Sequence, residues 1–338
     1  MIDAAPRPAA AAAATRMRAV HQSEYGEPEQ VLRPGTSPLP TISESQVMVK
    51  VHAAGVDRGV WHLVTGLPLP LRLAGFGMRR PKNPTPGLDV AGTVIEVGTA
   101  VTGFSVGDEV FGIGISTFAE YAACRADKLV HRPTSIDVRH AAVTAISGLT
   151  ALQAVRDHGK VTAGQNVLVI GASGGVGSFA VQIAAAYGAK VTGVCSTSKI
   201  AAVESLGADR VIGYERGWHD GIRYDVIIDT GGNTPLRTLL SSLTPQGTLV
   251  IVGGETGGRM LGGADRQLRA TLMKPFVKQR LAVFISSENA ADIGVLADMI
   301  AAGTVTPLID RSFTLDEAGA ALCYLAEGKA TGKVLISI

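Results

Sequence analysis

The segment from Val167 to Lys199 constrains the fold of this chain more than any other stretch. It reads VLVIGASGGVGSFAVQIAAAYGAKVTGVCSTSK, which predicts a β-strand, a glycine-rich turn, a helix and a second strand. Ala172, Gly174 and Gly177 have the spacing of a dinucleotide-binding turn, where the backbone approaches a pyrophosphate and a helix N-terminus attracts its charge. The turn therefore predicts a nucleotide site, against the alternative of a plain glycine-rich connection. The residues expected at the cofactor are Ala172, Ser173, Gly174, Gly175, Val176 and Gly177.

The pattern around this segment predicts two domains. From Met17 to about Asp137 the apolar runs are short, valine-rich and interrupted by glycine and proline, which is typical of a mostly antiparallel β domain. From His140 onward, strand patterns alternate with helix patterns, as expected for a parallel sheet built of βαβ units. We expect a disordered extension at residues 1–16, a catalytic β domain at 17–140 and 288–338, and a cofactor-binding domain at 141–287.

Composition excludes some functions. The 338 residues are 46% hydrophobic and carry a net charge of +2, and no basic run interleaved with aromatic residues indicates nucleic acid as a partner. No apolar stretch reaches the length of a membrane span. The three cysteines, Cys124, Cys195 and Cys323, fit neither a disulfide framework nor a zinc site. A cytoplasmic protein with a small-molecule substrate is the expectation.

The end of the second strand predicts which dinucleotide binds. NAD sites usually place an acidic residue about 20 residues beyond the glycines, where it accepts hydrogen bonds from the ribose. This chain has CSTSK at that place, Cys195 to Lys199. Ser196, Thr197 and Lys199 offer donors and a positive charge to a 2′-phosphate, so NADP(H) is favoured, although Lys199 could be a solvated lysine at a helix start. Tyr214, after the third strand pattern, is expected along the same phosphate or the adenine, or else in plain packing.

A family resemblance extends over about residues 17–338. The motifs that carry it are AAGVDRGVWHLVTG, PGLDVAGTVIEVG, VGDEVFGIG, ISGLTALQAV, GASGGVG, SLGADRVIGY and TGKVLISI, in this order. With them the chain resembles the medium-chain dehydrogenase/reductase superfamily, specifically its zinc-free quinone oxidoreductase-like branch, whose members are often named NAD(P)-dependent alcohol dehydrogenases. The resemblance implies an α/β protein with a Rossmann domain, a doubly wound parallel sheet, and a GroES-like, mostly antiparallel β catalytic domain. A cleft between them would hold the nicotinamide and the substrate.

The resemblance also bears on metal. Where zinc-dependent relatives have their catalytic ligands, this chain has Asp57, then Leu88 and Asp89, then Ile146. Leucine and isoleucine cannot ligate zinc, and carboxylates alone do not supply the nitrogen and sulfur ligands that zinc prefers. We therefore expect no metal.

Without zinc, the expected chemistry is reduction of a quinone or an activated C=C bond such as an enone, with NADPH as hydride donor. A zinc-free carbonyl or alcohol oxidoreductase is the near alternative, and a non-catalytic NADPH-binding sensor or structural protein is the distant one. The loop Asp57 to His62 lines the nicotinamide pocket by resemblance. His62 is the candidate proton donor, with Asp57 beside it, although His62 could be structural and Arg58 could pair with Asp57. The expected substrate-pocket residues are Arg58, Trp61, Phe76 and Met78.

Further positions follow from the resemblance. Thr150 is expected near the nicotinamide ribose or ring, Gly231 at the cofactor edge of the sheet, and Gly253 and Gly254 against the nicotinamide amide. Lys333 could reach the cofactor or could be exposed beside a strand.

Two basic segments are less typical of the branch. The segment Leu67 to Gly87 is long and basic, and is interpreted either as a lid that selects a bulky or acidic substrate or as solvated loop. Arg266 to Arg280 reads as one amphipathic helix that lies at the surface or at a subunit interface, and the strand pattern LAVFIS after it favours a homodimer.

Overall fold

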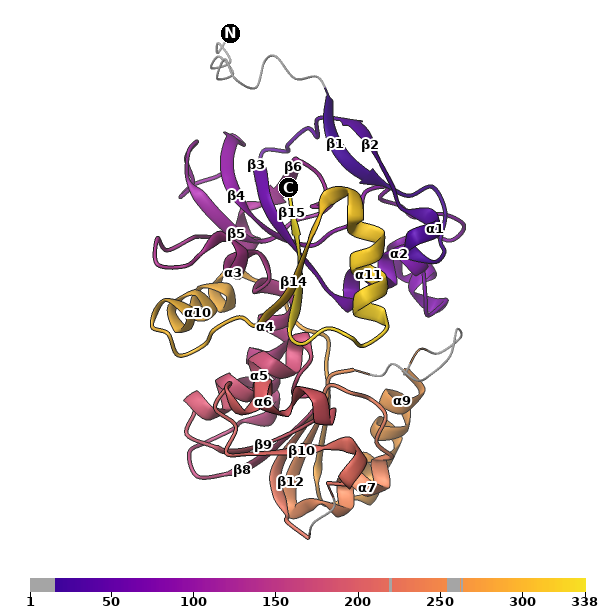
Figure 1. Cartoon of the computed structure of the whole chain (residues 1–338), viewed down its shortest axis with the longest axis vertical. Coiled ribbons are helices and arrows are strands. Elements are labelled where there is room, and N and C mark those ends of the chain that lie inside the picture. Colours follow the sequence, from indigo (N-terminus) through magenta and orange to yellow (C-terminus); the bar gives the residue numbers. More distant parts are fainter. Residues whose placement is uncertain (1–15, 219–220, 254–261, 263) are drawn as a thin grey trace.

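The computed structural model describes residues 16–218, 221–253, 262 and 264–338. Figure 1 shows two lobes, each built on its own sheet, with the chain passing from the upper lobe to the lower one and back. This arrangement confirms the α/β fold class, a parallel sheet beside a mostly antiparallel one. The residue limits of the two domains stay a prediction, and residues 1–15 of the expected extension lie outside the described residues. Arg16 does not fit a disordered extension, because it opens the first strand and donates to Thr36.

The upper lobe contains a two-stranded and a seven-stranded sheet. The strands of the larger sheet follow the order β14-β15-β3-β4-β5-β7, and β6 also pairs with β3. Apart from the parallel pair β14 and β15, the neighbours in it are antiparallel. The bounds are β1 (Arg16–His21), β2 (Arg33–Pro38), β3 (Gln46–Val56), β4 (Asp89–Val97), β5 (Glu109–Ile113), β6 (Tyr121–Arg125), β7 (Leu129–His131), β14 (Ile309–Thr314) and β15 (Lys333–Ser337).

The lower lobe contains six parallel strands in the order β10-β9-β8-β11-β12-β13. In sequence order this is 3-2-1-4-5-6, the order of a Rossmann sheet, in which ligands bind where the winding direction reverses, here between β8 and β11. The bounds are β8 (Asn166–Ile170), β9 (Lys190–Cys195), β10 (Arg210–Gly213), β11 (Tyr224–Asp229), β12 (Leu243–Ile251) and β13 (Arg280–Val283).

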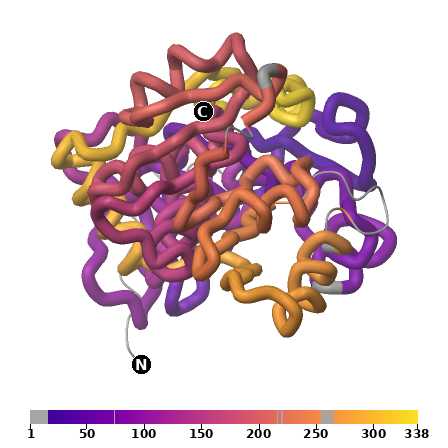
Figure 2. The backbone as a smooth tube through the Cα atoms, turned by 90° about the horizontal axis from the view of Figure 1, so that it is seen from below, coloured from indigo at the N-terminus to yellow at the C-terminus, as the bar shows by residue number. Residues whose placement is uncertain are grey.

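Helices cover both lobes and connect them. Those of the upper lobe are α1 (Pro28–Val31), α2 (Arg58–Thr65), α3 (Val138–Ala142), α10 (Ala290–Ala301) and α11 (Ala318–Ala326); the others are α4 (Ala145–Gln153), α5 (Gly175–Ala186), α6 (Ile200–Glu204), α7 (Leu236–Ser241) and α9 (Ala264–Met273). Figure 2, seen from below, places α9 and the segment around residues 67–80 on the same side of the molecule. There the backbone at Gly262 packs on Pro68, since a Cβ at position 262 would come within 2.6 Å of the proline ring.

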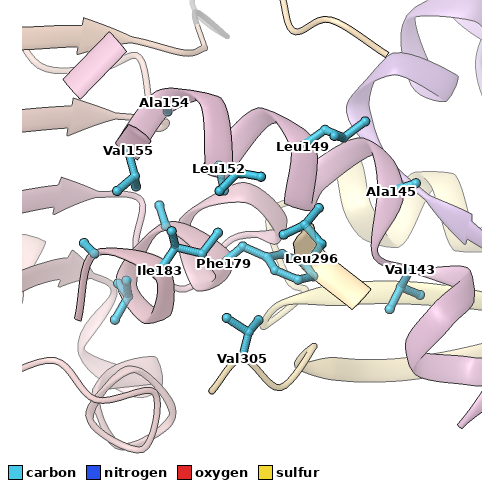
Figure 3. Packing of buried hydrophobic residues seen from close by; sticks show 14 of the residues in the cluster. Val143, Ala145, Leu149, Leu152, Ala154, Val155, Phe179, Ile183, Leu296 and Val305 are labelled. Atoms are coloured by element: carbon cyan, nitrogen blue, oxygen red, sulfur yellow. The ribbon is translucent and has the colours of Figure 1, made fainter. Parts of the chain in front are cut away.

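One continuous apolar core joins the two sheets. Helix α4 lies in it, with Leu149 and Leu152 packed near Phe179 and Ile183 of α5 and Leu296 of α10 (Figure 3). Each of these side chains is at most 1% exposed, and burying a side chain of this size contributes about 1.5–3 kcal/mol. The helix is therefore a shared wall and not a linker.

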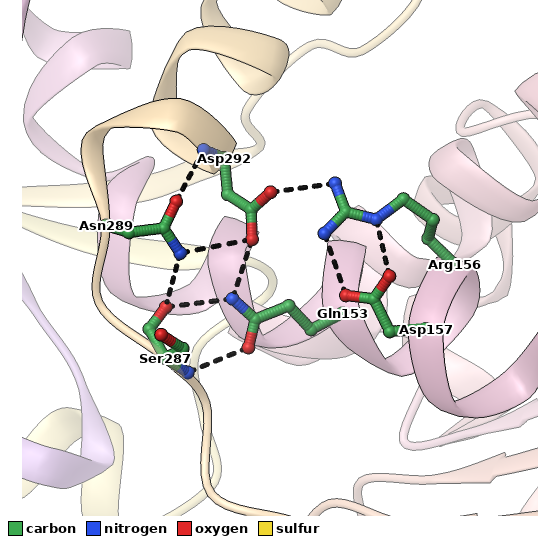
Figure 4. A network of polar contacts seen from close by, with 6 residues as sticks. All are labelled: Gln153, Arg156, Asp157, Ser287, Asn289 and Asp292. Carbon is green, nitrogen blue, oxygen red and sulfur yellow. Dashed lines mark hydrogen bonds and ion pairs between the residues drawn. The ribbon is translucent and has the colours of Figure 1, made fainter.

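A polar network holds the segment in which the chain returns from the lower lobe to the upper one (Figure 4). Gln153 on α4 donates to the Ser287 carbonyl at 2.8 Å and to Asp292 at 2.9 Å, and its own amide oxygen accepts from the Ser287 N–H. Arg156 donates to the other oxygen of Asp292 at 2.8 Å, and Asn289 caps α10 through the Asp292 N–H. The chain is thus held at Ser287 where it returns to the upper lobe.

The prediction of one helix over Arg266 to Arg280 is wrong. Helix α9 ends at Met273, a short 3₁₀ turn follows at Lys274–Phe276, and Arg280 begins β13. Pro275 explains the break, because proline lacks the N–H that continues a helix. Arg266 is also not a surface residue: it is 9% exposed and forms an ion pair with the fully buried Asp229 at the end of β11.

Candidate active site

The predicted cofactor residues meet at one edge of the parallel sheet. Apart from Thr150 on α4 and Lys333 on β15, each of those that the structure describes follows the carboxyl end of a strand, which is where doubly wound sheets bind ligands. The turn residues 172–177 follow β8, Ser196 to Lys199 follow β9, Tyr214 follows β10, Gly231 follows β11 and Gly253 follows β12. Gly254 lies outside the described residues. Thr150 sits on α4, where its hydroxyl donates to the Ile146 carbonyl at 2.8 Å and to the Ser286 hydroxyl at 3.3 Å.

The glycine-rich turn has the backbone that a dinucleotide requires. Gly171 takes a φ of 81°, and a Cβ at Gly177 would overlap the Gly171 carbonyl, so α5 approaches β8 closely because both residues are glycine. Gly174 is the N-cap of α5 and no side chain caps the helix. The first N–H groups of such a helix lack partners within it and attract an anion. The turn therefore fits the pyrophosphate of a nicotinamide dinucleotide.

The end of β9 carries both signs of charge. Lys199 donates to the Gly328 and Ala330 carbonyls at 2.8 and 2.7 Å, so its ammonium is held there and is not a freely solvated group. The Thr197 hydroxyl donates to Glu215 at 2.6 Å. Glu215 was missed by the sequence analysis; its only signal was its position next to Tyr214, whose hydroxyl lies beside Gly231.

A buried charge cluster lies behind the turn. Lys333, 1% exposed, extends its ammonium to Asp89 at 3.3 Å and to the Ser147 hydroxyl at 2.9 Å. The other oxygen of Asp89 accepts from the Ile146 N–H at 2.8 Å. A Cβ at Gly175 would come within 3.2 Å of the Lys333 side chain, and the Gly332 N–H donates to the Ser173 carbonyl at 2.7 Å. Lys333 is therefore buried under the turn, and the alternative of an exposed lysine is wrong.

Asp57 is a second carboxyl close to this cluster. It is 5% exposed and caps α2, with one oxygen accepting from the Val60 N–H at 3.1 Å. Its other oxygen is buried and has no hydrogen-bond partner among the described residues. Burial raises the pKa of Asp57, and the nearby Lys333 opposes that rise. Burial likewise raises the pKa of Asp89 to about 6, again opposed by Lys333. The ammonium of Lys333 thus partly compensates the charge of two buried carboxyls, Asp57 and Asp89.

Helix α2 carries the predicted proton donor. His62 Nδ1 lies 2.6 Å from the Leu67 carbonyl; since a carbonyl can only accept, Nδ1 carries a hydrogen and Nε2 is the atom that gains or loses a proton. Trp61 packs edge-on against the His62 ring, with the ring centres 5.2 Å apart. Arg58 lies over Trp61 and donates to the Ala326 carbonyl at 3.3 Å.

The two predicted pocket residues of the Leu67 to Gly87 segment, Phe76 and Met78, lie in different surroundings. Phe76 lines a cavity that Leu63 and Leu88 also line, whereas Met78 is 67% exposed. The segment is anchored by Tyr25, whose hydroxyl donates to the Phe76 and Gly77 carbonyls at 2.8 and 2.7 Å. Arg72 stacks over Tyr25 and donates to the Gly66 carbonyl at 2.9 Å. Arg72 is thus a structural residue of the segment.

The positions that correspond to zinc ligands do not form a ligand set. Leu88 and Asp57 both lie against Gly59, so an apolar side chain stands beside the carboxyl. Within the described part of the chain, no three histidine, cysteine, aspartate or glutamate side chains are placed to hold a metal ion.

Comparison with known proteins agrees with this architecture. Residues 43–134 match the model of an alcohol dehydrogenase GroES-like domain, and residues 206–336 match that of a zinc-binding dehydrogenase. A quinone oxidoreductase from Pongo abelii is 33% identical over 339 residues, which covers 95% of this chain and 97% of the relative. The chain belongs to the medium-chain dehydrogenase/reductase superfamily, in its zinc-free quinone oxidoreductase-like branch.

Solved structures of the superfamily superpose over nearly the whole chain. CurK enoyl reductase has a TM-score of 0.81 at 25% identity, covering 96% of this chain and 99% of its own. The mycobacterial protein Rv1454c, complexed with NADPH, has a TM-score of 0.80 at 25% identity, covering 95% and 100%. This medium-chain oxidoreductase thus has the cofactor-binding domain of nicotinamide-dependent enzymes. Among the described helices, none combines the length and apolar character that crossing a membrane requires.

The charge cluster makes a prediction about stability. Replacing Lys333 with methionine leaves two buried carboxyls without their cation, which should lower the free energy of unfolding by about 3–5 kcal/mol at pH 8. The loss should be smaller at pH 5. Asp89 already has a pKa of about 6, and without the ammonium this pKa rises further, so the folded state is most stable at low pH and loses stability as pH rises through the new value.

Urea unfolding at the two pH values measures this effect. The double variant Lys333→Met with Asp89→Asn is the matched control, since it removes one of the two uncompensated carboxyls and should recover part of the loss at pH 8. An equal loss at pH 5 and pH 8 would show that methionine acts through packing alone.

Proposed function

We propose that this oxidoreductase uses NADPH to reduce quinones or activated C=C bonds such as enones, without zinc. The observation that carries the proposal is Leu88, an apolar residue at a position where zinc-dependent relatives have a ligand. Leu88 lines a mostly apolar cavity and lies with Asp57 against Gly59. When bound, the nicotinamide supplies a hydride. An apolar wall suits a substrate whose own conjugation makes its β-carbon electrophilic, because no Lewis acid is then needed to polarise it.

His62 is proposed to supply the proton that follows. Its Nδ1 hydrogen is committed to the Leu67 carbonyl, so the imidazolium form would release its proton from Nε2, directly or through one water. Histidine changes charge near neutral pH, and a positioned general acid contributes about 10²–10⁴-fold in rate. Asp57 would hold the N-terminus of α2, and with it the direction of the helix, through its bond to the Val60 N–H.

The preference for NADPH is proposed to depend on a balance of charge at the end of β9. Ser196 and Lys199 offer donors to a 2′-phosphate, and a charge-assisted hydrogen bond contributes about 1.5–3 kcal/mol. Glu215 opposes this preference, because its carboxylate is bonded to Thr197 at the same edge.

Two alternatives remain. A zinc-free carbonyl reductase would use the same cofactor and His62, and a non-catalytic NADPH-binding protein would use the turn alone. We further propose a homodimer formed through β13, which is an edge strand of the parallel sheet.

A substrate panel separates these functions. NADPH oxidation is followed with quinones, enones, aldehydes and ketones in parallel, and we expect turnover of quinones and enones only. Turnover confined to aldehydes and ketones would favour the carbonyl reductase. Tight NADPH binding without turnover of any compound would favour the non-catalytic protein.

Two variants test the cofactor preference in opposite directions. Lys199→Ala should raise the KM for NADPH about tenfold, a loss of about 1.4 kcal/mol, while Glu215→Gln should lower it, because a repulsive charge is removed. Steady-state kinetics with NADPH and NADH measure both. Lys199 also holds the Gly328 and Ala330 carbonyls, so an equal rise with NADH would assign this lysine a structural role only.

Two substitutions of His62 distinguish catalysis from structure. His62→Gln should lower kcat for an enone at least about tenfold, leave NADPH affinity nearly unchanged and flatten the alkaline fall of the pH profile. His62→Asn is the matched control, because its amide N–H can replace Nδ1 toward Leu67 while offering no titrating nitrogen. If His62→Asn restores the parental rate and pH profile, His62 is structural and the proton comes from solvent.

A further inference from the structure

The cavity beside Leu88 has a volume of about 240 Å³. Its wall is mostly apolar and contains Leu63, Phe76, Leu88, Ile113 and Ile115. Leu63 follows His62 on α2, and Leu88 lies against Gly59 together with Asp57. The cavity therefore borders α2, the helix that carries the proposed proton donor, and its wall suits an apolar body.

The charged residues of the wall are not equivalent. Three are cations, Lys82, Arg125 and Lys128, and one is an anion, Glu288. Arg125 is neutralised by Asp127, with contacts of 2.9 and 2.5 Å, and Lys128 by Glu288. Over the residues that the structure describes, no carboxylate pairs with Lys82. The wall thus keeps one uncompensated positive charge.

The chain just before Lys82 adds to this charge. Arg79 and Arg80 are exposed, and within the described ranges neither has an ion pair or a side-chain hydrogen bond. The segment is nevertheless not loose, because Tyr25 holds the Phe76 and Gly77 carbonyls and the Lys82 N–H donates to the Phe76 carbonyl at 2.8 Å. The backbone of this segment is therefore anchored beside the cavity, and the three cations that it carries raise the local concentration of anions.

The wall also contains a strained residue, Ser116. Ser116 has a φ of 63°, an uncommon conformation for a residue other than glycine, which tends to persist at binding sites. Ser116 lines the same cavity as Lys82, whereas the next residue, Thr117, is fully buried and is not one of the lining residues.

We propose that the substrate is an amphipathic anion: a quinone or enone whose apolar body fills the cavity and whose carboxylate pairs with Lys82 at the Arg79 to Lys82 segment. This inference depends on the proposed reductase function. It assigns Lys82 the role of a specificity-determining residue, and it explains why the Leu67 to Gly87 segment is basic where it borders the cavity.

A matched pair of substrates tests the charge. The enone para-carboxybenzylideneacetone is compared with its methyl ester, and kcat/KM is measured with saturating NADPH for the parent, Lys82→Ala and Lys82→Glu. The ratio of acid to ester is compared between proteins, so that the different intrinsic reactivities of the two compounds cancel. Lys50→Glu is the control for a general change in net charge, since Lys50 is exposed on β3.

We expect the ratio of acid to ester to fall at least fivefold in Lys82→Ala and further in Lys82→Glu, through KM, and to remain at the parental value in Lys50→Glu. High salt should lower kcat/KM for the acid and leave kcat/KM for the ester unchanged. A parental ratio in both Lys82 variants would overturn the proposal.

Binding decides the inference separately from turnover. Calorimetry with NADP⁺ present measures the affinity for the saturated acid and the saturated ester, which requires no reaction. If neither enone is reduced but the acid still binds tighter than its ester and loses this advantage in Lys82→Glu, the anion site stands and the proposed reductase function fails. If the two bind equally to the parent while both enones are reduced, the function stands and the anion site is wrong.

Discussion

The ion pair between Lys333 and Asp89 is the interaction on which the site depends. Its two side chains are 1% and 0% exposed and come from positions 244 residues apart. The Ser147 hydroxyl on α4 also accepts from this ammonium, so β4, β15 and α4 meet at one charge. Isolated charges in such a place would be strongly destabilising. The arrangement therefore fixes how β15 enters the upper sheet, and it holds Gly332 against the Ser173 carbonyl of the nucleotide turn.

The same cluster shapes the chemistry of the site. Leu88 and Ile146 occupy two of the positions that correspond to zinc ligands, and two carboxyls remain. Both accept hydrogen bonds from the backbone: Asp57 caps α2, and Asp89 accepts from the Ile146 N–H. Lys333, buried under the nucleotide turn, supplies the positive charge of this cluster. Leu88 and its neighbours line a mostly apolar cavity. The proposed substrate would thus meet a largely apolar surface next to α2, the helix that carries the proposed proton donor His62.

The proposed cofactor preference would depend on residues from two lobes. The CSTSK run at the end of β9 lacks an acid, yet the fold brings Glu215 from the end of β10 to Thr197, and it brings the Gly328 and Ala330 carbonyls to Lys199. A cation already shared with two carbonyls binds an added phosphate less strongly than a free one, because part of its hydrogen-bonding capacity is used. The proposed preference would consequently depend on the arrangement of both lobes and not on one strand end.

The sequence by itself determined the fold class, the family and the edge of the sheet at which a cofactor binds. These follow from local patterns: glycines at fixed spacing, the alternation of strands and helices, and motifs in a fixed order. Tertiary structure alone decided the pairing of Lys333 with Asp89, the contact of Glu215 with Thr197, the pairing of Arg266 with Asp229, and the packing of Arg72 over Tyr25. The physical reason is that charges pair across space with whichever partner the packed backbone brings near. Separation along the chain carries no signal of that distance.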